Sequence, residues 1–162
     1  MAMVYVSLGS NIDAEAHLGL GVNELRRRYG SVQLSPVYRN AAVGFEGKDF
    51  LNLVAGFESD SSPLAICEEI ELIHNLAGRD RKAGKWEARP LDIDLLLYND
   101  RVMVERPVRI PREDVLAYSF VLRPLAELAP GLVHPVTGRT MLDHWNEFDA
   151  SSHPLTEVDV VL

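Results

Sequence analysis

Hydrophobic and polar residues alternate along several short stretches of the chain, as they do in strands that are buried on one face. The clearest of these stretches is Leu91–Tyr98 (LDIDLLLY). The same pattern predicts further strands at Met3–Leu8, Val32–Arg39, Leu51–Glu58 and Arg101–Glu105. We expect Arg101–Glu105 to pair with Leu91–Tyr98 across a turn at Asn99–Asp100, and Pro36 to lie at an edge or bulge of its strand.

Two segments between these strands carry apolar residues every three or four positions, which predicts amphipathic helices. The residues of the apolar faces are Leu18, Val22, Leu25 and Tyr29 in the first helix, and Ile66, Ile70, Ile73 and Ala77 in the second. Gly30 and Gly78 follow these faces and are expected to end the two helices. Ser62 and Pro63 are a good N-cap and first residue for the second helix.

The C-terminal third of the chain predicts two shorter helices. Phe120–Leu128 is apolar, and we expect Pro124 in its first turn because proline lacks the N–H that a helix interior needs. Met141–Phe148 predicts the other helix, and Thr137–Gly138 a hairpin turn. Short turns join antiparallel neighbours. We therefore expect an α+β fold of one domain, residues 1–162, with a mainly antiparallel sheet and helices on its faces.

Composition narrows the class of protein further. The chain has 162 residues, 47% of them hydrophobic, and a net charge of −8. This apolar content argues against a disordered chain, and no apolar run approaches the roughly 20 residues of a membrane helix. The acidic balance argues against a general nucleic-acid binder. Cys67 is the single cysteine, so an intrachain disulfide is impossible, and we expect a cytoplasmic protein without a signal peptide.

A pair of carboxylates interrupts the predicted strand Leu91–Tyr98. Side chains two residues apart in a strand share a face, so Asp92 and Asp94 are expected on one face and Leu91, Ile93, Leu95 and Leu97 on the other. Two adjacent carboxylates repel each other unless a cation intervenes, and Mg²⁺ prefers one or two carboxylates together with phosphate oxygens and water. The alternative is a solvated polar face on an edge strand.

A basic segment stands directly before this strand. Its cations are Arg79, Arg81, Lys82, Lys85 and Arg89, opposed only by Asp80 and Glu87. Arginine and lysine bind phosphate oxygens, so cations beside a carboxylate pair predict a polyphosphate site. Trp86 in this segment either caps the core or stacks on an aromatic ligand. No P-loop or dinucleotide fingerprint is present in the sequence, and the five histidines show no metal-ligand spacing.

The chain resembles the hydroxymethyl-dihydropterin pyrophosphokinase family of folate biosynthesis, from its first strand to about His134. The segments that carry the resemblance, in order, are Tyr5–Asn11 (YVSLGSN), Ser35–Arg39 (SPVYR), Asp49–Asn52 (DFLN), Gly78–Lys82 (GRDRK), Trp86–Arg89 (WEAR), Leu91–Asp94 (LDID) and Phe120–Leu125 (FVLRPL). Each segment alone is a weak signal, whereas all of them in this order and spacing are a strong one.

The resemblance implies a ferredoxin-like α/β sandwich and an enzyme that moves the β,γ-pyrophosphoryl group of ATP to the hydroxymethyl oxygen of 6-hydroxymethyl-7,8-dihydropterin, releasing AMP. It implies two Mg²⁺ ions on Asp92 and Asp94, with ATP as co-substrate. The residues implied to contact the phosphates are Arg79 and Arg89, with Arg81, Lys82, Ile110 and Arg112 binding ATP. Those implied to bind the pterin are Val43, Phe50, Asn52, Trp86 and Phe120. Nucleic acid and membranes are not expected as partners, and a monomer or weak homodimer is expected.

Some positions depart from the family pattern. Arg112 follows Pro111 where the family usually has histidine, and His74 stands where it has glutamate. Asn40–Ala41 and Glu87–Ala88 also differ. We expect Arg112 to contact ATP phosphates, the alternative being that it points to solvent. These departures leave open a non-catalytic or altered-substrate pterin- or nucleotide-binding relative. A Mg²⁺-dependent nucleotidyl transferase is a third possibility, against which Phe50, Asn52 and Phe120 speak.

Overall fold

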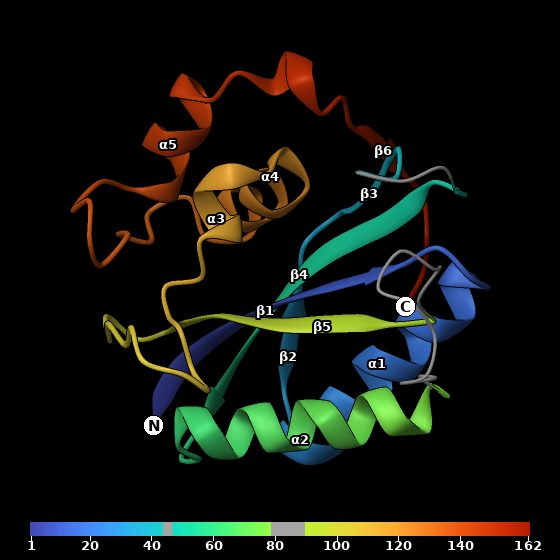
Figure 1. Cartoon of the computed structure of the whole chain (residues 1–162), viewed down its shortest axis with the longest axis horizontal. Helices are drawn as coiled ribbons and strands as arrows, with labels where there is room; N and C mark the ends of the chain where they lie inside the picture. The colour runs from blue at the N-terminus through green and yellow to red at the C-terminus, as the bar shows by residue number, and fades with distance from the viewer. Residues whose placement is uncertain (44–46, 79–89) are drawn as a thin grey trace.

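A computed structural model describes residues 1–43, 47–78 and 90–162. Its centre is a six-stranded sheet in the order β5-β1-β4-β3-β6, with β2 also pairing with β4 (Figure 1). Every pairing is antiparallel. The strands are β1 (Ala2–Ser10), β2 (Val32–Leu34), β3 (Val37–Asn40), β4 (Phe50–Ser59), β5 (Asp92–Tyr98) and β6 (Thr156–Val158). The helices are α1 (Ala14–Tyr29), α2 (Pro63–Leu76), α3 (Asp114–Ala117), α4 (Ser119–Leu128), α5 (Met141–Glu147) and the 3-10 turn η1 (Ala150–Ser152).

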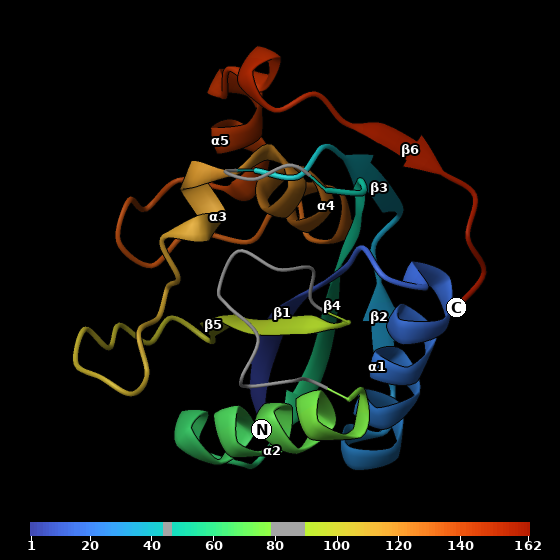
Figure 2. The same cartoon turned by 45° about the vertical axis from the view of Figure 1, so that its right-hand side comes forward.

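Helices cover both faces of the sheet, so the fold has three layers (Figures 1 and 2). On one face, here called the α2 face, α1 and α2 pack against Val6, Leu8, Phe57 and Ile93. On the opposite face, here called the α4 face, the short helices α3, α4 and α5 enclose a second apolar core. The expected α+β class with helices on the faces of an antiparallel sheet is confirmed. No helix among the described residues is long and apolar enough to cross a membrane.

Local sequence signals explain several helix ends and turns. The hydroxyl of Ser62 accepts a hydrogen bond from the Ala65 N–H, with Pro63 as the first residue of α2. Gly30 ends α1 with φ of 84°, which a residue with a Cβ rarely adopts. The turn expected at Thr137–Gly138 is confirmed, because the Gly138 N–H donates to the His134 carbonyl and Gly138 has φ of 72°.

The strand expected at Val32–Arg39 is in fact two strands, broken at Ser35–Pro36. Proline has no N–H for the sheet, and the side chain of Ser35 substitutes for a backbone group there. The Ser35 Oγ accepts a hydrogen bond of 2.9 Å from the Val54 N–H. The expected position of Pro124 in the first turn of its helix is also wrong, because Pro124 lies in the interior of α4.

The pairing expected between Arg101–Glu105 and β5 is wrong. Asn99 follows β5 in a left-handed conformation with φ of 48° and is hydrogen-bonded to Met3 of β1 through its backbone and its side chain. Met103 then forms an isolated bridge with Ile110 instead. The outer edge of β5 is therefore open to other partners, and its Leu96 carbonyl accepts from the Arg112 N–H at 2.9 Å.

A β-bulge in β5 changes which side chains share a face. Tyr5 pairs with Leu97 and Val6 with Leu95, so Leu96 is an extra residue between them. Beyond the bulge the alternation reverses: Leu97 joins Leu96 in the core of the α4 face. The expectation that Leu97 lies with Leu91, Ile93 and Leu95 is therefore wrong, whereas Asp92 and Asp94, before the bulge, do lie opposite Ile93.

Candidate functional site

One row of residues crosses three strands at the end of the sheet where β1 stops and β5 begins. Asn52 of β4 and Asp92 of β5 are both paired with Gly9 of β1. Directly paired residues point to the same face, here the α4 face. Neighbouring strands are about 4.8 Å apart, so the α-carbons of Asn52 and Asp92 are separated by about 10 Å. Because Gly9 has no side chain, the row has a floor of backbone between an amide and a carboxylate.

The amide of Asn52 is held in one orientation. Its Nδ2 donates to the Oδ1 of Asn40, and the Nδ2 of Asn40 donates to the carbonyl of Ala41 at 2.9 Å. The Oδ1 of Asn52 consequently lies over Gly9, where a Cβ would come within 2.5 Å of it. This contact explains the need for glycine at position 9. The amide therefore presents an oriented polar edge above the floor.

Asp94 lies one residue beyond Ile93 on the same face as Asp92. It pairs across the strands with Ser7, another small residue, and 38% of its side chain is exposed. Burial of the carboxylate raises the pKa of Asp94; Arg112 lowers it only in part, and Asp92 and Asp114 add further negative charge. Among the described residues, the carboxylates around Asp94 outnumber the one arginine that pairs with it.

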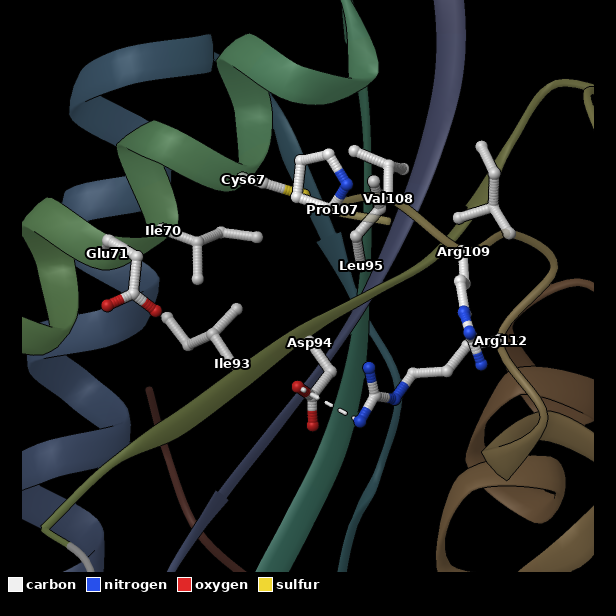
Figure 3. A pocket seen from close by; sticks show the side chains of 11 residues that line it. Cys67, Ile70, Glu71, Ile93, Asp94, Leu95, Pro107, Val108, Arg109 and Arg112 are labelled. Atoms are coloured by element: carbon white, nitrogen blue, oxygen red, sulfur yellow. Dashed lines mark ion pairs between the residues drawn. The ribbon is translucent and has the colours of Figure 1, made fainter. Parts of the chain in front are cut away.

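Arg112 is that cation. Its Nη2 lies 3.6 Å from the Oδ1 of Asp94 (Figure 3). Its Nε lies 3.2 Å from the Oδ2 of Asp114, outside hydrogen-bonding geometry. Burial would lower the pKa of Arg112, but the two carboxylates raise it above its ordinary value. The alternative that Arg112 simply points to solvent is therefore wrong. Its contact with ATP phosphates stays a prediction.

A cleft of about 290 Å³ opens beside Asp94, along the outer edge of β5. Figure 3 shows α2 on one side of it and the segment around residues 107–112 on the other. Ile110 and Arg112, expected from the sequence to bind ATP, both line it. Sequence reasoning missed the other lining residues, which include Cys67, Glu71, Val108 and Arg109. Only the spacing of Cys67 and Glu71, one turn apart on α2, hinted that they share a surface.

Three further expected pterin-binding residues are among the described residues. Phe50 begins β4 and shares the α4 face with Asn52, because side chains two apart in a strand lie on the same side. Phe120, near the start of α4, contributes to the core of the α4 face and stacks on Tyr118 with ring centroids 4.9 Å apart. Val43 is 42% exposed. The structure thus brings Phe50, Asn52 and Phe120 to the same side of the sheet as the carboxylates.

The expected contributions of the basic segment lie outside the described residues. Arg79, Arg81, Lys82, Trp86 and Arg89 all belong to 79–89. Their roles stay predictions. What the structure describes is where this segment attaches, namely Gly78 after α2 and Pro90 two residues before β5.

The carboxylate pair suits a magnesium ion that is also bound by phosphate. In the part of the chain that the structure describes, no group of three or more metal-binding side chains comes together. Asp92 and Asp94 therefore match an ion that takes one or two carboxylates and fills its other positions with phosphate oxygens and water. The unbalanced negative charge around Asp94 also favours a cation.

Comparison with known proteins agrees with this geometry. The sequence profile of the family described as 7,8-dihydro-6-hydroxymethylpterin-pyrophosphokinase (HPPK) matches residues 5–130. A 2-amino-4-hydroxy-6-hydroxymethyldihydropteridine pyrophosphokinase of Aquifex aeolicus is 32% identical over 138 residues, which are 84% of this chain and 86% of that relative. A protein of the same name from Porphyromonas gingivalis is 36% identical over 141 residues, 83% of this chain and 95% of the relative.

Solved structures share the fold. Wild-type HPPK-DHPS of Plasmodium falciparum superimposes with a TM-score of 0.71 at 14% identity, covering 90% of this chain and 44% of that one. An HPPK-DHPS in complex with substrates gives a TM-score of 0.76 at 11% identity. The chain spans less than half the length of these structural neighbours. The family profile covers most of the described sheet and both of its helical layers, and the chain belongs to the 7,8-dihydro-6-hydroxymethylpterin-pyrophosphokinase family.

Proposed function

We propose that this protein transfers the β,γ-pyrophosphoryl group of ATP to 6-hydroxymethyl-7,8-dihydropterin. In this reaction a bond forms between the hydroxymethyl oxygen and the β-phosphorus of ATP. The bond from the β-phosphorus to the oxygen that bridges to the α-phosphorus breaks. AMP leaves with that oxygen, and the hydroxyl proton is released. Membership of the family supports the proposal, and the row Asn52–Gly9–Asp92 is the structural observation that carries it.

The row suits this substrate because the pterin ring would be recognised at one end, by Asn52, and would react at the other end, near Asp92. The pterin ring would lie between Asn52 and Asp92, with its polar edge toward the fixed amide of Asn52 and the rings of Phe50 and Phe120 against its faces. Its hydroxymethyl group would then point along the row toward Asp92. An enzyme that holds both reactants in line gains much of its rate from this positioning, since phosphoryl transfer needs little covalent help from the protein.

Asp92 and Asp94 are the residues that would hold magnesium, and we propose two ions by the family resemblance. When bound, Mg²⁺ neutralises phosphate oxygens and stabilises the charge that develops on them. The cleft beside Asp94 would receive the nucleotide, with Ile110 as an apolar wall. Arg112 lines the cleft beside Asp94, so it can exchange part of its pairing with Asp94 for a phosphate oxygen.

The nucleotide product distinguishes this proposal from its alternatives. With Mg²⁺ and ATP, we expect AMP only when 6-hydroxymethyl-7,8-dihydropterin is added. Release of inorganic pyrophosphate instead of AMP would indicate nucleotidyl transfer. Binding of both ligands with no product would indicate the non-catalytic relative.

The single cysteine allows a separate test of the nucleotide cleft. Cys67 lines the cleft, so a bound nucleotide should shield it from a thiol reagent. Burial and the nearby charge of Asp94 raise the pKa of the Cys67 thiol, so labelling is best followed at mildly alkaline pH. A non-hydrolysable ATP analogue with Mg²⁺ should slow labelling, and Cys67→Ser serves as the blank. Equal labelling with and without a saturating analogue would place the nucleotide elsewhere.

A further inference from the structure

His74 is buried in α2 and is bonded at both of its ring nitrogens. Only 3% of the residue is exposed. Its Nε2 lies 2.8 Å from the backbone nitrogen of Ile93, and its Nδ1 lies 3.1 Å from the Oε1 of Glu71. Through these two contacts His74 links Glu71, in the wall of the cleft, to Ile93, the second residue of β5.

These partners fix the tautomer of the imidazole. A backbone N–H can only donate, so the Nε2 of His74 must carry its lone pair toward Ile93. The proton of the neutral ring is then on Nδ1, where it is donated to the carboxylate of Glu71. A proton on Nε2 would place two donors against each other in a buried site.

The position of Ile93 gives this contact its significance. Ile93 lies between Asp92 and Asp94, and its side chain packs in the core of the α2 face. Among the strands of the described residues, β5 is the outer one and pairs with β1 alone. Within residues 1–43, 47–78 and 90–162, no strand pairs with the outer edge of β5 to fix the backbone at the two carboxylates. His74 supplies that missing partner at the residue between them.

We infer that His74 is a positioning residue for the pyrophosphoryl transfer proposed above, on which this inference rests. By accepting a hydrogen bond from the Ile93 N–H, it fixes the position and twist of the backbone at the β5 edge. It thereby fixes the directions in which the side chains of Asp92 and Asp94 point. Through Glu71 its ring is tied to the wall of the cleft. The carboxylates of β5 and the wall of the cleft formed by α2 are thereby held in a fixed position relative to each other.

Three variants test this assignment. His74→Leu keeps the apolar bulk but removes the acceptor. His74→Gln restores an acceptor, because its Oε1 can reach about as far as Nε2. Ile66→Val, a fully buried change in the same helix, is the control for a general loosening of α2. The readouts are kcat, the Mg²⁺ concentration at half-maximal rate, and the exchange protection of the Ile93 amide.

We expect His74→Leu to lower kcat by about tenfold to a hundredfold, as misplacement of reacting groups by up to 1 Å does, and to raise the Mg²⁺ requirement. The Ile93 amide should lose its protection. His74→Gln should recover most of the rate and of the protection, and Ile66→Val should leave both near the wild-type values. Normal kcat, Mg²⁺ requirement and Ile93 protection in His74→Leu would overturn the assignment.

Nitrogen-15 spectra of the wild-type ring give an answer even if His74→Leu does not fold. The assignment predicts a protonated Nδ1 and an unprotonated Nε2, and the reverse would refute it. These spectra and the Ile93 protection do not depend on turnover. A wild-type protein that shows the predicted tautomer but forms no AMP would refute the proposed function and leave the His74 contact in place.

Discussion

Gly9→Ala is a small change that should weaken pterin binding and leave binding of an ATP analogue unchanged. The added methyl carbon would lie 2.5 Å from the Oδ1 of Asn52. That is well inside van der Waals contact, so the Asn52 side chain has to rotate away. Rotation breaks its hydrogen bond to Asn40 and removes the oriented amide from above the floor.

The size of the effect follows from the interactions that are lost. The Asn52–Asn40 hydrogen bond contributes about 0.5–1.5 kcal/mol to stability, and a forced fit in a packed region typically costs about 1–3 kcal/mol. We therefore expect a free energy of unfolding lower by about 1–3 kcal/mol. A pterin whose polar edge loses its partner should bind more weakly by about 1–3 kcal/mol, a factor of about 5 to 150.

Calorimetric titration with 6-hydroxymethylpterin, in the presence of a non-hydrolysable ATP analogue, measures this loss directly. Gly19→Ala is the matched control, since nothing lies within 4 Å of a Cβ at position 19 of α1. It should stabilise the protein by about 0.5–1 kcal/mol and leave pterin binding unchanged. The affinity of the ATP analogue alone should be the same in both variants. If Gly9→Ala binds the pterin as tightly as the wild type, the ring does not lie over the row Asn52–Gly9–Asp92.

Three further variants probe the carboxylates, the arginine and a helix cap. Asp94→Asn should abolish turnover. The pKa of Asp94 is raised in the folded protein, so protonation of this carboxyl stabilises the fold. This stabilisation is fully present below the ordinary pKa of 3.8 and is lost as the pH rises through the raised pKa. The melting temperature of Asp94→Asn relative to wild type should therefore increase from pH 3 to pH 7, and a constant difference would contradict this. Arg112→Ala should weaken binding of an ATP analogue by about 1.5–3 kcal/mol, and Arg112→His should add a pH dependence near neutrality; equal affinities in all forms would remove Arg112 from the site. Ser62→Ala should lower the free energy of unfolding by about 1 kcal/mol in denaturant titration without changing turnover, because it removes the cap of α2.

Residues near each other in sequence were predicted well, because the signals are local. The helices α1 and α2 follow from apolar spacing and from Ser62, Pro63 and Gly30. The strands β1, β4 and β5 follow from alternation, to within one or two residues at each end. The pairing of Asp92 with Asp94 on one face needs only the two-residue period of a strand, and the structure confirms it.

Features that depend on distant parts of the chain were not predictable in this way. The bulge at Leu96 reverses the alternation, and nothing in the period of LDIDLLLY marks it. The row Asn52–Gly9–Asp92 is set by the register of three strands. The pattern of residues within a single strand does not reveal this register. The cleft forms where α2 meets the segment around Val108, about forty residues later in the chain. His74 was considered for metal-ligand spacing and as a departure from the family's glutamate, neither of which reveals its contact with a backbone N–H.

The most direct test of the proposed reaction follows the terminal phosphates of ATP. The protein is incubated with Mg²⁺, 6-hydroxymethyl-7,8-dihydropterin and ATP labelled at the γ-phosphate, and every labelled and adenine-containing product is separated and counted. Transfer of the intact pyrophosphoryl group predicts that the label moves to the pterin in equal amount with the AMP formed, and that neither appears without the pterin. Label recovered as inorganic phosphate or pyrophosphate, or ADP formed in place of AMP, would contradict it.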